Sequence, residues 1–412
     1  MNDILQLLPD MKSGDELFSE LSVVPDYSDG ARFQNQSERL IALSDLYKFY
    51  VPSAMTTEIY SKLYLALLHS MQKKFTRSTV VQQNVNHIGM QQQSYNGIIG
   101  GSDSFTIIGT SGIGKSAAIN RSIDLLSANG VIETKTPYRK IIPCVVVQCP
   151  FDSSVKGLLL EILRKVDEVI GSEYYNKSLK VRVTTDMLIG SVSQVAINHI
   201  GLLVVDEIQN VVNSKNGRNL VGMLTQLINN SGISICMVGT PESSPFFEQA
   251  LQLARRSIGL HYSALAYDDF FDTFCRTLFA YQYTKERTEI TDAIVGWLYE
   301  HSGGIISVVV SLIHDAQEIA ILSGKEMLCL ETLNAAYKQR LSLLHDYIEP
   351  TIKRGKQTTA SRVNKVDRSS VTDTTNLNID VSISQIVAEA QNSGTDVVVL
   401  LKKYLSVEEV VI

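Results

Sequence analysis

Residues 107–116 read IIGTSGIGKS, in which two apolar residues run into a glycine-rich loop that ends in lysine and serine. From Gly109 the stretch fits the pattern G-x-x-x-x-G-K-[ST], the signature of a phosphate-binding loop. Glycine lets the backbone curl so that successive N–H groups point at phosphate oxygens, and the following helix adds its positive end. The apolar run before the loop predicts a strand, and KSAAINRSIDLL after it predicts a helix.

The loop residues have distinct expected roles. Lys115 should reach the β- and γ-phosphates of a nucleotide, and the hydroxyl of Ser116 should bind Mg²⁺. We therefore expect ATP and Mg²⁺ as cofactors. The residues expected to bind the nucleotide are Gly109, Thr110, Ser111, Gly112, Ile113, Gly114, Lys115, Ser116 and Ala117, together with Asp206 from a second motif.

That second motif is LLVVDE (202–207), an apolar strand that ends in two acids. Asp206 is expected to hold the magnesium ion with Ser116, and Glu207 to orient and activate the attacking water. The alternative is a strand capped by surface acids. A glutamate directly after the aspartate favours hydrolysis by a built-in base over a kinase or a small GTPase. The motif therefore predicts an ATPase, which converts ATP and water to ADP and phosphate.

Two further features could complete a catalytic site. The predicted strand ISICMVGT ends at Thr240, which would lie beside the γ-phosphate, although a strand cap explains the residue equally well. Arg255 and Arg256 follow in QALQLARRSIG. Adjacent arginines usually lie on a solvated surface. In a ring-forming ATPase, however, one of them would reach the γ-phosphate of the neighbouring subunit and neutralise transition-state charge.

The bulk composition is that of an ordinary globular protein, with 44% hydrophobic and 19% charged residues. A net charge of −6 argues against a protein coated in basic charge, but it leaves room for a local basic groove. The five cysteines are scattered without a CxxC pair, which indicates reduced thiols. No secretory signal and no apolar run of membrane-spanning length are apparent. We expect a cytoplasmic protein without membrane contact.

Strands and helices alternate from about residue 104 to 240, and the strands are continuous apolar runs. This pattern predicts an α/β fold with helices on both faces of a parallel sheet. Residues 1–30 are polar and acidic and are expected to form a loosely held lead-in. The predicted divisions are an N-terminal lead-in and helical segment (1–95), a nucleotide-binding core (96–264), a helical lid (265–350), a polar basic linker (351–380) and a C-terminal partner-docking segment (381–412).

Four stretches carry a family resemblance: VVVQCPFDSSVKGLLLEILRKVDEVIGSEY (145–174), HIGLLVVDEIQNV (199–211), ICMVGTPES (235–243) and LARRSIGLHY (253–262). They resemble the TnsC family of AAA+ ATPases and its TniB relatives, which regulate transposon insertion. The resemblance extends over roughly residues 31–345. It implies an AAA+ P-loop core, preceded by a helical segment and followed by a helical lid and a tail.

The resemblance also implies partners. It implies a protein that assembles with ATP into rings or filaments around duplex DNA and links a target-selection protein to the transposase, with hydrolysis limiting how long the assembly persists. By position, Thr240 would be the first sensor and Arg255 or Arg256 the finger that acts across the subunit interface. Residues after the second strand would contact DNA without sequence preference. These are Lys156, Lys177, Lys180 and Arg182, for which a solvated helix face is the alternative.

Two positions depart from the family. Asn210 stands where a histidine is usual, and the expected lid helix GGIISVVVSL (303–312) lacks the arginine that touches nucleotide in many AAA+ lids. Coupling between nucleotide and lid should therefore be weaker or use another residue. Two other functions stay open: a nucleotide-gated scaffold with little hydrolysis, and an AAA+ loader in replication or repair.

Overall fold

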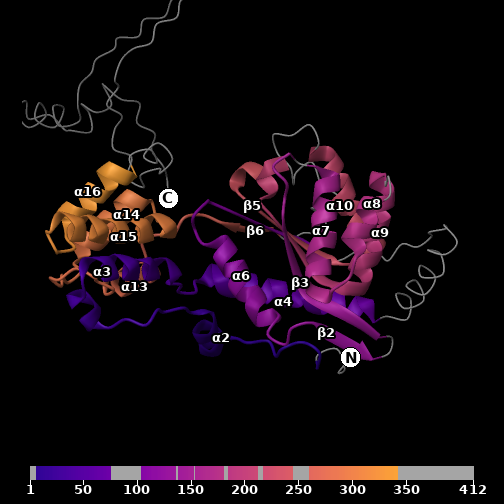
Figure 1. The fold of residues 1–412 in the computed structure, drawn as a ribbon, viewed down its shortest axis with the longest axis horizontal. Helices are drawn as coiled ribbons and strands as arrows, with labels where there is room; N and C mark the ends of the chain where they lie inside the picture. The colour runs from indigo at the N-terminus through magenta and orange to yellow at the C-terminus, as the bar shows by residue number, and fades with distance from the viewer. Residues whose placement is uncertain are drawn as a thin grey trace, which may run out of the picture. The chain divides into compact units, whose positions relative to one another are not determined.

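The computed structural model describes residues 6–75, 104–135, 138–152, 154–180, 184–211, 217–244 and 259–341 (Figure 1). The chain divides into two units, residues 1–354 and 355–412. The second unit lies wholly outside the described residues, as does the predicted basic linker. The proposed roles of these segments, and the division of the chain into five parts, stay predictions.

A six-stranded sheet carries the nucleotide-binding motifs. The strand order is β2-β3-β4-β5-β1-β6, and β2 at one edge runs antiparallel to β3 while the other described strands are parallel. β1 lies between β5 and β6, so the loop after β1 emerges beside the carboxyl ends of both. The strands are β1 (Phe105–Gly109), β2 (Ile132–Lys135), β3 (Tyr138–Gln148), β4 (Ile200–Asp206), β5 (Ser234–Gly239) and β6 (Gly259–Tyr262).

Helices cover both faces of this sheet (Figure 1). Leu203 and Val205 of β4 face a core closed by α7 (Val155–Ile170), α9 (Thr185–His199) and α10 (Gly217–Ser231). Leu202 and Val204 face the opposite core, which α4 (Ala54–Lys74) and α6 (Lys115–Leu126) close. This alternation follows from the two-residue period of a strand and explains why β4 is apolar throughout. The predicted α/β class with a parallel sheet is confirmed.

The N-terminal segment is more ordered than its composition predicts. Residues Gly14–Leu21 form helix α2, in which Leu17 and Leu21 are buried. These two leucines, four residues apart on one helix face, join the core beside α4 and α6. The expectation of a loosely held lead-in over residues 1–30 was therefore wrong for this helix, because two well-spaced leucines outweigh a polar composition.

Residues after α2 connect the core to the lid. They form η1 (Asp29–Phe33), α3 (Gln36–Ala42) and η2 (Leu43–Lys48). Leu43 and Leu46 of η2 are buried among the lid helices. The lid itself consists of α13 (Asp269–Phe279), α14 (Asp292–Ser302), α15 (Ile306–Ser323) and α16 (Leu330–Arg340). Its predicted all-helical character is confirmed over the described residues, and part of its core comes from the N-terminal segment.

Helix α15 is long and apolar enough to cross a membrane by length and composition, contrary to the prediction that no run reaches this length. Half of this 18-residue window is buried within the protein. Val309, Leu312 and Ile313 are fully buried in the lid core. Its apolar sequence is thus accounted for by packing on several sides at once.

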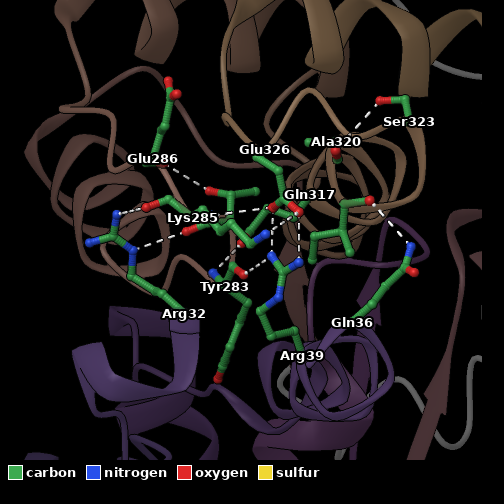
Figure 2. A network of polar contacts seen from close by, with 12 residues as sticks. Arg32, Gln36, Arg39, Tyr283, Lys285, Glu286, Gln317, Ala320, Ser323 and Glu326 are labelled. Atoms are coloured by element: carbon green, nitrogen blue, oxygen red, sulfur yellow. Dashed lines mark hydrogen bonds and ion pairs between the residues drawn. The ribbon is translucent and has the colours of Figure 1, made fainter. Parts of the chain in front are cut away.

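Arginines tie the N-terminal segment to two loops of the lid (Figure 2). Nη1 and Nη2 of Arg39 donate to the two carboxylate oxygens of Glu326 at 2.6 and 2.7 Å, and Nη1 also donates to the carbonyl oxygen of Tyr283 at 2.9 Å. Nε of Arg32 donates to the carbonyl oxygen of Thr284 at 2.9 Å. Arg39 is 2% exposed, so this clamp lies inside the protein and fixes the N-terminal segment to the lid.

Candidate nucleotide site

The candidate site lies where the carboxyl ends of β1, β4 and β5 meet. The register pairs Ile108 with Gly239 and Val205 with Met237, so the residues that follow these three strands emerge side by side. Ligands of open α/β sheets bind at this edge. The two motifs found in the sequence, which are far apart along the chain, therefore lie together.

Glycines give the loop after β1 its shape. Gly112 and Gly114 have φ angles of +82° and +96°, in the left-handed region that disfavours side chains. Gly109 is needed for a different reason, because a Cβ there would lie 2.7 Å from the carbonyl oxygen of Tyr262 in β6. The N–H of Thr110 donates to that same carbonyl oxygen at 3.2 Å. The loop is thus tightly curled and anchored to the neighbouring strand.

Lys115 begins helix α6 and folds back over the loop. Its Nζ donates to the carbonyl oxygens of Gly109 at 2.6 Å and Thr110 at 2.8 Å, and the residue is 9% exposed. Burial lowers the pKa of Lys115, and the carboxylates of Asp206 and Glu207 oppose that shift. Among the described residues the hydrogen-bond partners of Lys115 are backbone carbonyls, which it can exchange for phosphate oxygens without breaking an ion pair.

Ser116 and Asp206 come together at the mouth of the loop. The Ser116 hydroxyl donates to Oδ2 of Asp206 at 3.2 Å, while Oδ1 of Asp206 accepts from the backbone N–H of Glu207 at 2.8 Å. A hydroxyl oxygen and a carboxylate oxygen on the exposed side of a phosphate loop form a donor set that suits Mg²⁺, which prefers oxygen ligands and retains several waters. The residues present therefore fit the expected metal.

Glu207 has an unusual backbone. Its φ angle is +58°, a left-handed conformation that costs a residue with a Cβ about 1–2 kcal/mol. The residue lies between β4 and the short helix η3 (Ile208–Val211). Its backbone carbonyl accepts from the N–H of Asn210 at 3.0 Å, which closes a tight turn at the end of the strand. Backbone strain of this kind concentrates at functional sites.

Residues 100–262 match the family model described as the bacterial TniB protein. This part of the chain is similar to the TniB family. The resemblance inferred from the sequence is therefore confirmed over the sheet and both nucleotide motifs, and the TniB region is an AAA+ nucleotide-binding domain. None of the curated proteins matches the sequence.

Two solved structures are similar to this chain at low identity. The ORC1 protein of Aeropyrum pernix, in complex with DNA, has 13% identity and a TM-score of 0.40, over 64% of this chain and 65% of that one. The chain thus spans just under two thirds of that protein. The ORC of Drosophila, bound to DNA, has 12% identity and a TM-score of 0.44, over 97% and 83% of the two chains. Similarity at this level says nothing of ligands or partners.

Two residues that the sequence did not single out, Gln209 and Glu242, also lie at this site. The side-chain amide of Gln209 donates to Oε2 of Glu207, and its amide oxygen accepts from the N–H of Thr240 at 3.3 Å. A hydrogen bond with the Thr240 side chain lowers the pKa of Glu242, and Lys115 lowers it further. Both overlooked residues lie inside stretches that carried the family resemblance, DEIQN and GTPES, which was the available signal.

Not every predicted residue can be located. Thr240 lies at the end of β5, in the same cluster as Glu207 and Lys115, and its role as a sensor stays a prediction. Arg255 and Arg256 lie outside the described residues, and so does Arg182. The proposed finger and that DNA contact stay predictions.

The described DNA-contact candidates do not form one patch. Lys156 is exposed in the first turn of α7, which follows the strand end nearest the nucleotide motifs. Lys177 is exposed in α8 (Tyr174–Lys180), whose first N–H groups donate to the carboxylate of Asp167 near the other end of α7. Only Lys156 of this pair shares the sheet edge that carries the phosphate loop.

The lid reaches the phosphate loop without an arginine. The backbone N–H of Ser307, in the first turn of α15, donates to the carbonyl oxygen of Gly112 at 3.1 Å. A Cβ on Gly112 would lie 2.8 Å from Cγ2 of Ile305, so the lid packs closely on the loop. Ser307 therefore links the first turn of α15 to the phosphate loop.

Proposed function

We propose that the chain is an ATP-hydrolysing regulator of DNA transposition that assembles on duplex DNA and links a target-selection protein to the transposase. The observation that supports it most directly is the Ser116–Asp206 contact of 3.2 Å beside the enclosed Lys115, within a region that matches the TniB family. ATP hydrolysis to ADP and phosphate would set the lifetime of the assembly.

In this proposal, each residue of the site has one task. Lys115 leaves the loop carbonyls to neutralise the β- and γ-phosphates. Ser116 and Asp206 hold Mg²⁺, which supplies positive charge against the phosphates when bound. Glu207 accepts a proton from the attacking water, and Thr240 lies beside the γ-phosphate.

Assembly would complete the site. Arg255 or Arg256 of a neighbouring subunit would supply the finger that neutralises charge in the transition state, in a ring or a helical filament. Lys156, Lys177, Lys180 and Arg182 would contact phosphates of the duplex, so binding should be independent of sequence and weaken steeply with salt. The helical lid would close over the nucleotide, and residues 381–412 would dock the partner proteins. We place this function in the cytoplasm, away from membranes.

Electron microscopy with duplex DNA tests the proposal. Wild-type protein with a non-hydrolysable ATP analogue should form rings or filaments on DNA, because bound nucleotide would complete the subunit interface. The Glu207→Gln variant should form the same assemblies with ATP itself and keep them, with phosphate release reduced by about 100-fold or more. Lys115→Met is the matched control and should form none.

Two outcomes contradict different parts of the proposal. Protein that stays monomeric on DNA with the analogue contradicts the assembly. Phosphate release that is equally slow in wild type and Glu207→Gln, with assemblies present in both, identifies the nucleotide-gated scaffold instead.

A further inference from the structure

Gln209 occupies a bridging position that the reaction outlined above does not use. It lies in η3, two residues after Glu207, and its side chain spans from the end of β4 to the end of β5. The amide nitrogen donates to the carboxylate of Glu207, and the amide oxygen accepts from the backbone N–H of Thr240. A single side chain thus joins the expected base to the strand end expected beside the γ-phosphate.

Glutamine suits both contacts at once. A carboxylate needs a donor and a backbone N–H needs an acceptor, so the two partners require opposite ends of one amide. A glutamate at this position would oppose the carboxylate of Glu207, and an asparagine is one methylene shorter. Gly239 leaves the space for this arrangement, because a Cβ there would lie 3.3 Å from Oε1 of Gln209 and 2.7 Å from Cγ2 of Ile208.

Hydrogen bonds of the backbone fix the turn that carries Glu207, whereas the side chain of Gln209 holds the Glu207 carboxylate. The N–H of Glu207 donates to Asp206, its carbonyl accepts from Asn210, and the side chain of Asn210 donates to the carbonyl oxygen of Cys149 in the strand end alongside. Among the described residues, Gln209 provides the hydrogen bond that reaches the carboxylate itself. The direction of that carboxylate therefore depends on Gln209.

The contacts continue towards the phosphate loop. The side chain of Thr240 hydrogen-bonds with Glu242, whose charge interacts with Lys115. Gln209 thus links Glu207 to the turn that carries Thr240 and Glu242.

We infer that Gln209 is a positioning residue that orients the carboxylate of Glu207. Because the same side chain accepts from the N–H of Thr240, that orientation also depends on the contacts at the end of β5. The inference rests on the proposed function, since it takes Glu207 as the base for water. Without the amide donor the carboxylate can rotate away from the attacking water.

Steady-state ATP hydrolysis by the full chain, measured with DNA, tests this role. Gln209→Met keeps the volume of the side chain but loses donor and acceptor, and Gln209→Glu keeps its shape but reverses the interaction with Glu207. Both should lower kcat by about 10- to 100-fold and leave the KM for ATP within about twofold, a split between kcat and KM that a general loss of folded protein does not produce.

A double variant shows whether Gln209 acts through Glu207. Gln209→Met should lower kcat no further in a Glu207→Gln background, because the carboxylate it orients is already absent. An unchanged kcat in the single variants, or an equal further loss in the double variant, overturns the inference while leaving Glu207 as the base. If Glu207→Gln itself hydrolyses ATP at the wild-type rate, both this inference and the base assignment fail.

Discussion

Glu207 beside the phosphate loop and Glu326 in the lid share a backbone conformation that the other described non-glycine residues avoid. Their φ angles are +58° and +55°. Each also has an enclosed cation nearby, Lys115 in the core and Arg39 in the lid clamp. The two regions therefore contain the same ingredients, a buried positive charge and a glutamate in a strained turn, but they combine them differently.

In the lid, the two charges are paired directly. Both carboxylate oxygens of Glu326 accept from Arg39, and this contact is the main cause that lowers the pKa of Glu326 (Figure 2). In the core, Lys115 donates to backbone carbonyls and Glu207 accepts from a neutral amide. Strain alone does not mark a functional site. A cation and a carboxylate that lie close without pairing leave both groups open to a ligand.

The largest expected difference is in the stability lost when each of the two cations, Arg39 and Lys115, is replaced. Arg39→Ala leaves Glu326 without its partner and the carbonyl of Tyr283 without a donor, which should lower the free energy of unfolding by about 3 kcal/mol. Lys115→Met removes a cation that has no ion pair to lose, so stability should change by less than about 1 kcal/mol while affinity for ATP falls by about 100-fold.

Trp297, the single tryptophan, lies in α14 and reports unfolding of the lid by fluorescence. Urea unfolding of both variants, with binding of a fluorescent ATP analogue, separates the two effects. Lys48→Ala, which loses only an exposed contact with Asp45, is the control for Arg39 and should cost less than about 1 kcal/mol. A large loss of stability in Lys115→Met would show that this cation is structural as well.

The strained turns give a second, smaller contrast. Replacing each glutamate by alanine removes the carboxylate and keeps the strain, whereas glycine removes both. Glycine should be about 1 kcal/mol more stable than alanine at position 207 and at position 326, since the backbone is alike. The change from glutamate to glycine should differ between them. Glu326→Gly should lower the free energy of unfolding by about 2 kcal/mol, because the ion pair with Arg39 is lost. Glu207→Gly should lower it by less than about 0.5 kcal/mol.

Hydrogen exchange of β4 amides follows the variants at 207, and tryptophan fluorescence follows those at 326. Glu207→Gly should also lose ATP hydrolysis while staying folded. An equal loss of stability for the two glycine variants would mean that the carboxylate of Glu207 is held as firmly as that of Glu326, and the comparison between the two regions would fail.

The sequence predicted the core well because its signals are local. The loop from Gly109 to Ser116 requires glycines at fixed spacing, and the apolar strand before Asp206 predicts burial on both faces. The short strands β2 and β6 and the helix α8 were not predicted, since four to seven residues carry too little periodicity.

The lid clamp could not be predicted from sequence for a different reason. Arg39 and Glu326 are separated by 287 positions, and both belong to residue types that normally face solvent. Their pairing becomes apparent only once the N-terminal segment is seen to pack on the lid. Gln209 was overlooked because its role depends on the distance between two strand ends, which no spacing within DEIQN reveals.

Lys74 offers a third enclosed cation, which has no carboxylate partner among the residues that the structure describes. It is 3% exposed, and its Nζ donates to the carbonyl oxygens of Ala196 and Ile197 at 2.8 and 2.9 Å. Burial lowers the pKa of Lys74 to about 7. Between pH 7 and the ordinary lysine value near 10.5 the unfolded chain therefore binds more protons than the folded one, so stability should rise with pH across that window.

Unfolding between pH 7.5 and 9 isolates this smallest effect. Over this interval the free energy of unfolding of wild type should rise by about 1–2 kcal/mol relative to that of Lys74→Met. The comparison between the two proteins is needed because burial raises the pKa of buried thiols such as Cys144 and Cys275, which opposes the rise equally in both. Lys48→Met, at an exposed lysine, should keep the wild-type slope. His199, whose pKa burial lowers, titrates below the interval and does not contribute. If Lys74→Met keeps the wild-type slope, the carbonyl oxygens of Ala196 and Ile197 hold the ammonium ion charged despite burial, whereas Lys115 also has carboxylates nearby that oppose the lowering of its pKa.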